Sequence, residues 1–147
     1  MEWTWSEWLE WGAKIVGALA TGAGVLVAAF NYRSQTQIKR AEWIKSLFEK
    51  FFETAIYKEV RIWLDYGELH EKLTVADDSE RRANEEKFTD FLNFFEFIGV
   101  LSGKQLSFEE VFEVFDYYLE RIKTDADCQD WIERYSFEKL KALLVHV

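Results

Sequence analysis

An all-α fold is predicted from three features of the sequence. Proline, which breaks helix interiors, is absent from all 147 positions. The alternation of Val, Ile and Thr that is typical of half-buried strands is hard to find, whereas apolar residues recur mostly three and four positions apart. We therefore expect an N-terminal transmembrane helix followed by a cytoplasmic bundle of four to five helices.

Residues 1–11 are predicted to form a short extracytoplasmic segment that is rich in tryptophan. Tryptophan is enriched at the interface between a membrane and water. A secretory signal peptide begins with positive charge, whereas acidic residues come first here, which favours an uncleaved anchor. The residues concerned are Trp3, Trp5, Trp8, Trp11, Glu2, Glu7 and Glu10.

Residues 12–32 are predicted to span a membrane. No charged residue lies between Lys14 and Arg33, and the stretch from Ile15 to Tyr32 provides about 27 Å of helix, close to the thickness of a bilayer core. Lys14 lies near enough to the end for its amine to reach the headgroups, which extends the span to Gly12. We expect lipid to surround this helix.

Small side chains lie along one face of this predicted span. They recur at spacings of four, four, three and four, so that a second helix can approach closely. The same residue types are also common in passive anchors, but we expect this face to hold copies of the chain together. The predicted oligomerisation face consists of Ala13, Gly17, Thr21, Gly24 and Ala28.

Charge is distributed unevenly beyond the span. Residues 33–64 carry seven basic and four acidic groups, whereas residues 65–147 carry ten basic and twenty acidic groups. Basic residues beside a span favour the cytoplasmic side, so we expect a bacterial inner-membrane protein with its N-terminus outside and residues 33–147 in the cytoplasm. The basic residues expected to contact lipid headgroups are Arg33, Lys39, Arg40 and Lys45.

The cytoplasmic part divides into predicted helices. Apolar positions from residue 34 onward predict a helix that continues from the span, and a following pattern ends at Gly67. Residues 74–84 predict a solvated loop and the start of the next helix. Residues 88–101 predict a central helix that Gly99 and Gly103 terminate. Further helices are predicted over 107–123, where Ser107 and Glu110 form a capping box, over 127–134 and over 136–145.

No motif for catalysis, cofactor binding or metal binding is present in the sequence. It contains no Gly-rich phosphate loop, Ser-His-Asp set or zinc-binding pattern, and its single cysteine cannot form an internal disulfide. The acidic distal part argues against direct DNA binding. We therefore expect no enzyme activity, no cofactor and no metal.

Glu96 is the strongest local exception, because it is a carboxylate within a helix whose other faces are aromatic. A buried carboxylate needs a partner, and Arg61 is our candidate. The pair would read a ligand or act as a switch, or it would simply fix the register of two helices.

The sequence resembles a group of small bacterial membrane proteins with one N-terminal span, a basic exit and a cytoplasmic helical bundle. The resemblance is carried by the span followed by Arg33 to Arg40, the segment that begins with Arg61, the Leu92 to Glu96 run, and Gly99 and Gly103. This layout is similar to the membrane accessory protein of type VI-B CRISPR systems. The resemblance implies an oligomeric, pore-like component of antiphage defence. The sequence lacks the spacing of arginine and histidine that is typical of HEPN ribonucleases, so the resemblance implies no nuclease activity.

Two functions are consistent with these predictions. The first is an oligomeric inner-membrane effector or accessory protein in antiphage defence, which perturbs membrane integrity when triggered. The alternative is a membrane-tethered adaptor whose acidic bundle recruits a soluble partner, such as another defence-system protein. The expected partners are therefore the lipid bilayer, further copies of the chain and possible soluble protein partners.

Overall fold

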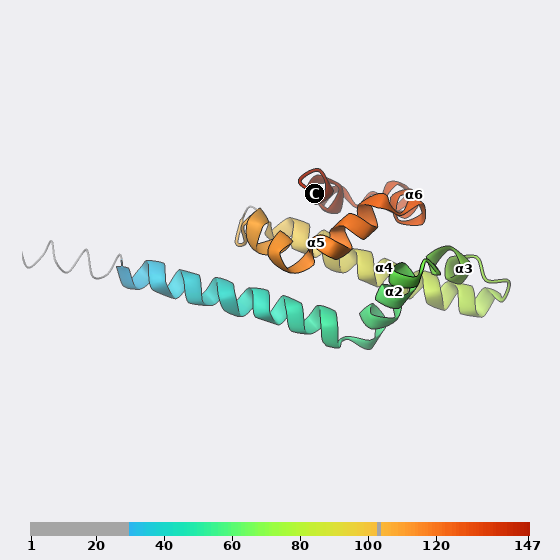
Figure 1. The fold of residues 1–147 in the computed structure, drawn as a ribbon, viewed down its shortest axis with the longest axis horizontal. Coiled ribbons are helices and arrows are strands. Elements are labelled where there is room, and N and C mark those ends of the chain that lie inside the picture. Colours follow the sequence, from blue (N-terminus) through green and yellow to red (C-terminus); the bar gives the residue numbers. More distant parts are fainter. Residues whose placement is uncertain (1–29, 103) are drawn as a thin grey trace, which may run out of the picture. The chain divides into compact units, whose positions relative to one another are not determined.

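The computed structural model describes residues 30–102 and 104–147, and their regular secondary structure is helical, which confirms the predicted all-α class. Residues 30–53 form one uninterrupted helix (Figure 1). The helices that follow are α2 (Ala55–Tyr66), α3 (Leu69–Leu73), α4 (Asp78–Leu101), α5 (Phe108–Thr124), α6 (Ala126–Tyr135) and α7 (Glu138–Leu144). The prediction of four to five helices was too low, because a break at Thr54 separates α2 from the preceding helix and the short α3 was not foreseen.

The chain divides into two compact units, residues 1–41 and residues 42–147, and the hydrophobic core belongs to the second. The predicted span over 12–32 lies outside the described residues except for its last three positions. Within the described part of the chain, no helix is both long enough and apolar enough to cross a membrane.

Most helix boundaries follow from local capping. Gly67 adopts a left-handed conformation with φ of 70°, and its N–H and that of Glu68 donate to the last carbonyls of α2, which ends this helix where the sequence predicts. Asp77 accepts a 2.8 Å hydrogen bond from the Glu80 N–H and begins α4. Both hydrogen bonds of the predicted Ser107–Glu110 capping box are present at the start of α5. Local sequence therefore determines these ends.

The prediction that Gly99 terminates the central helix is wrong, because α4 continues through this residue to Leu101. A Cβ atom at Gly99 would lie only 2.5 Å from the carbonyl oxygen of Lys139. The glycine is therefore required for close approach between α4 and the start of α7.

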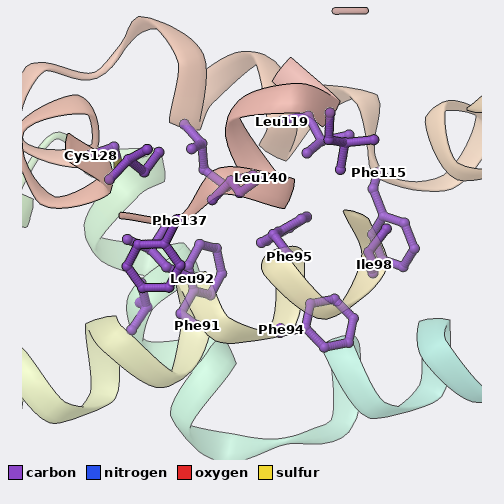
Figure 2. Close-up of a cluster of buried hydrophobic side chains, with 14 of the residues drawn as sticks. Phe91, Leu92, Phe94, Phe95, Ile98, Phe115, Leu119, Cys128, Phe137 and Leu140 are labelled. Atoms are coloured by element: carbon purple, nitrogen blue, oxygen red, sulfur yellow. The ribbon is translucent and has the colours of Figure 1, made fainter. Parts of the chain in front are cut away.

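The core is centred on phenylalanines of α4 and on Phe51. Phe51 is completely buried, and its ring centre lies 5.1–5.8 Å from five other aromatic ring centres, those of Phe91, Phe94, Phe95, Phe115 and Tyr118. Figure 2 shows the α4 rings beside Phe115 and Leu119 of α5 and near Phe137 and Leu140. Burial of each such ring contributes about 1.5–3 kcal/mol, so α4 is the element around which the other helices are organised.

Candidate functional site

The chain changes direction at the end of the helix over residues 30–53, and a buried arginine of the next helix lies at this point. Residue 54 lies between this helix and α2, and Arg61 of α2 is buried, with 9% of its surface exposed. We call the group formed by Phe51, Phe52, Arg61 and Tyr118 the Arg61 joint.

The guanidinium of Arg61 is held by aromatic faces and by a backbone carbonyl. Its central carbon lies 4.5 Å from the ring centre of Phe52, 5.0 Å from that of Phe51 and 5.9 Å from that of Tyr118. Its Nη2 atom donates a 3.1 Å hydrogen bond to the carbonyl oxygen of Phe52. Cation–π contacts of this kind contribute about 0.5–2 kcal/mol each, and the charge lies at the negative end of a helix dipole.

Polar groups of α2 and α5 surround this joint. The hydroxyl groups of Tyr117 and Tyr118 donate to the two oxygens of Asp65, at 3.0 Å and 3.4 Å. Burial, together with the charge of Asp65, raises the pKa of Tyr118, whereas the hydrogen bond to Asp65 is the main cause of the raised pKa of Tyr117. Arg121 of α5 donates to the carbonyl oxygen of Leu64 near the end of α2. These contacts link α5 to α2 beside Arg61.

The predicted pair of Arg61 and Glu96 is not formed. Arg61 makes the contacts given above, whereas Glu96 is only half buried and accepts hydrogen bonds from the N–H groups of Lys139 at 3.0 Å and Leu140 at 2.7 Å. Phe137, which precedes α7, makes no capping hydrogen bond through its side chain. The carboxylate of Glu96 therefore caps α7 from α4, and this backbone partner makes a cationic partner unnecessary.

The predicted lipid-contact residues all belong to the helix over residues 30–53. Arg33, Lys39, Arg40 and Lys45 are exposed, and Lys45 forms a 3.5 Å ion pair with Glu49. The predicted oligomerisation face, from Ala13 to Ala28, lies outside the described residues.

Within the described residues, the titratable groups do not form a catalytic constellation. No cluster of three or more potential metal ligands occurs among them. The Cys128 thiol is fully buried, and burial raises its pKa, which keeps it in the unreactive protonated form. His70 pairs at 3.0 Å with Asp127 of α6.

Sequence reasoning missed the roles of Tyr118 and Asp65. Both lie on amphipathic helices, and each has the residue type of an ordinary surface position. The detectable signal was the arginine itself, which stands between the apolar residues Val60 and Ile62 in the middle of a helix. That signal indicated a buried cation, but it did not identify the aromatic rings that surround it.

Comparison with known proteins places the chain in a family. Residues 18–144 match the family described as "Domain of unknown function (DUF4760)". No curated protein and no solved structure gives a significant match. Because the match covers the predicted exit from the membrane and nearly all of the helical bundle, the chain belongs to the DUF4760 family.

Proposed function

We propose that this protein is an oligomeric effector or accessory protein of the bacterial inner membrane, which perturbs membrane integrity in antiphage defence when its bundle is triggered. Residues 12–32 span the membrane, with the N-terminus outside and the bundle in the cytoplasm. The small-residue face from Ala13 to Ala28 holds copies together. The resemblance in layout to the membrane accessory protein of type VI-B CRISPR systems supports the role in defence.

The observation that carries this proposal is the uninterrupted helix over residues 30–53. Its described residues include Phe30 to Tyr32 of the predicted span, and Phe51 in its last turn is completely buried in the core. Neither glycine nor proline occurs between Val25 and Tyr66. Because no helix-breaking residue interrupts this stretch, we propose that a change in the bundle is passed along it toward the predicted span.

The Arg61 joint connects the helix over residues 30–53 to α2. Arg61 binds the carbonyl oxygen of Phe52, at the last turn of the helix, and lies on α2, whose neighbours include α4 and α5. The Tyr118 ring of α5 lies 5.9 Å from the guanidinium carbon, so α5 also contributes to the joint. Exposed Arg33, Lys39 and Arg40 attract anionic headgroups, each contributing about 1 kcal/mol, and keep the helix exit at the membrane surface.

Dye release from liposomes tests this function. The full-length chain is reconstituted, with subunit number measured by crosslinking, and the span is either native or replaced by a poly-Leu helix. The effector proposal expects crosslinked oligomers and release by the native chain, with release lost in the poly-Leu chain. A monomeric chain that releases no dye under any trigger tested contradicts it.

The alternative function is a membrane-tethered adaptor that recruits a soluble partner. It is favoured by the excess of acidic residues over residues 65–147, which gives this part of the bundle a surface suited to a basic partner. The span-replacement experiment separates the two functions. An adaptor keeps its activity with an unrelated span, whereas an effector that acts on the bilayer loses it.

A further inference from the structure

A pocket of about 240 Å³ lies between the C-terminal end of α4, the start of α5 and α7. Gly99, Val100, Phe108 and Leu143 form much of its wall, and their surfaces are apolar. Known pockets for drug-sized ligands are larger, at about 300–1,000 Å³. The volume therefore suits a compact ligand with one small apolar group.

The polar residues that line this pocket are two lysines, one histidine and one serine, and none of them carries a negative charge. Lys104 reaches it from the loop between α4 and α5, Lys139 from the first turn of α7, and His146 from the C-terminal end. Among the described residues, no carboxylate lies within ion-pair distance of Lys104 or Lys139. Two lysines without an ion-pair partner among the described residues therefore line this pocket in a chain of net charge −9.

Ser102 also lines the pocket, but its Oγ atom is inaccessible and has no hydrogen-bond partner among the described residues. A ligand in the pocket cannot contact this buried atom, so the polar contacts are assigned to the exposed side chains of Lys104, Lys139 and His146.

Two acidic residues of α4 and α5 accept hydrogen bonds from backbone N–H groups. The Glu96 carboxylate caps the N–H groups of Lys139 and Leu140, and the Glu110 carboxylate accepts from the Ser107 N–H. The His146 ring lies 4.2 Å from the Phe108 ring, measured between centres and tilted by 32°. An imidazole donor is therefore held against an aromatic face at the edge of the pocket.

We propose that this pocket binds a small phosphate monoester. Its phosphate oxygens accept hydrogen bonds from Lys104, Lys139 and His146, and its organic group packs on Val100, Phe108 and Leu143. Phosphate is favoured over a carboxylate because it offers three acceptor oxygens to donors that three separate segments place in the pocket lining. The proposal does not depend on the membrane function, since every residue involved belongs to the bundle.

Calorimetry on the full-length chain, in neutral detergent and phosphate-free buffer, tests this site with phenyl phosphate as the probe. We expect saturable binding of one molecule per chain, and weaker binding of inorganic phosphate, which has no group for the apolar wall. The double variant K104E/K139E is expected to weaken phenyl phosphate binding at least about tenfold, because it replaces two attractive charges by repulsive ones.

The matched control is K58E/K123E, which makes the same change of net charge at two exposed lysines of α2 and α5. Phenyl phosphate affinity that is equal in the two double variants overturns the proposal, as does the absence of saturable binding by the native chain at millimolar probe. A parallel titration with micelles that contain dioctanoyl phosphatidic acid identifies the source of the phosphate. Lysine-dependent binding of phenyl phosphate but not of phosphatidic acid indicates a soluble ligand, and lysine-dependent binding of both indicates a lipid headgroup.

Discussion

Arg61 contacts Phe52 twice, because its guanidinium lies 4.5 Å from the ring centre and also donates a 3.1 Å hydrogen bond to the carbonyl oxygen of the same residue. One side chain of α2 thereby fixes both the backbone and the aromatic ring at the last turn of the preceding helix. This relationship ties the helix over residues 30–53 to the bundle, and it gives the first prediction.

Arg61→Lys is expected to lower the free energy of unfolding by about 1–2 kcal/mol, because an ammonium group cannot stack on Phe52 as a planar guanidinium does. Urea unfolding of the full-length chain, followed by circular dichroism, measures this change. Arg82→Lys is the matched control, since Arg82 is exposed on α4. Equal stability of the two variants contradicts the role given to the joint.

Glu96→Ala is expected to destabilise the chain by about 0.5–2 kcal/mol, the usual cost of removing a helix N-cap. The variant leaves the N–H groups of Lys139 and Leu140 without their acceptor. Hydrogen exchange should accelerate first in α7, and Glu96→Gln, which keeps one acceptor oxygen, should have a smaller effect. The control is Glu86→Ala, which removes an exposed carboxylate from the same helix. Unchanged hydrogen exchange in α7 for both alanine variants would contradict the capping role of Glu96.

Gly99→Ala is expected to destabilise the chain, although alanine ordinarily stabilises a helix interior by about 1 kcal/mol relative to glycine. The new Cβ would lie 2.5 Å from the Lys139 carbonyl oxygen, so α7 must move away from α4. Thermal unfolding tests the sign of the effect. Asn93→Ala, at an exposed position of α4, provides the comparison and should be neutral or slightly stabilising. A raised melting temperature for Gly99→Ala would exclude the close approach.

The pair of His70 and Asp127 predicts a pH dependence. The hydrogen bond to Asp127 and the charge of this residue raise the pKa of His70 above its ordinary value of 6.5. The pair's contribution to stability is therefore fully present below the unfolded pKa and is lost as pH rises through the higher folded pKa. Titration by nuclear magnetic resonance should give a lower His70 midpoint in Asp127→Asn than in the native chain. Identical His70 midpoints in both proteins would show that the pair does not form in solution.

Local signals in the sequence were sufficient for most helix boundaries. Ser107 with Glu110, and Gly67, act through atoms within a few residues, so their effects can be derived from spacing alone. Gly99 was misinterpreted because a glycine that ends a helix and a glycine that admits a neighbouring backbone look the same in a sequence. Only the position of Lys139, forty residues later, distinguishes them.

The candidate site was harder to predict from the sequence than the helix boundaries, because its contacts join residues that are distant in the chain. Arg61 was identified correctly as a buried cation, but its partners are aromatic rings of Phe51 and Phe52 and not the carboxylate of Glu96. Charge complementarity suggested that pairing, whereas the backbone of α7 satisfies Glu96. The phosphate pocket brings Lys104 and Lys139 together from separate segments, which no short motif records.

Membrane fractionation tests the central claim most directly. Bacteria that express the full-length chain are lysed without detergent, the lysate is ultracentrifuged, and the membrane pellet is washed with alkaline carbonate to remove peripheral proteins. The proposed span over residues 12–32 predicts that the chain stays in the washed pellet and is released by detergent. Recovery of the intact chain in the first supernatant would contradict the span, the inner-membrane location and the effector function together.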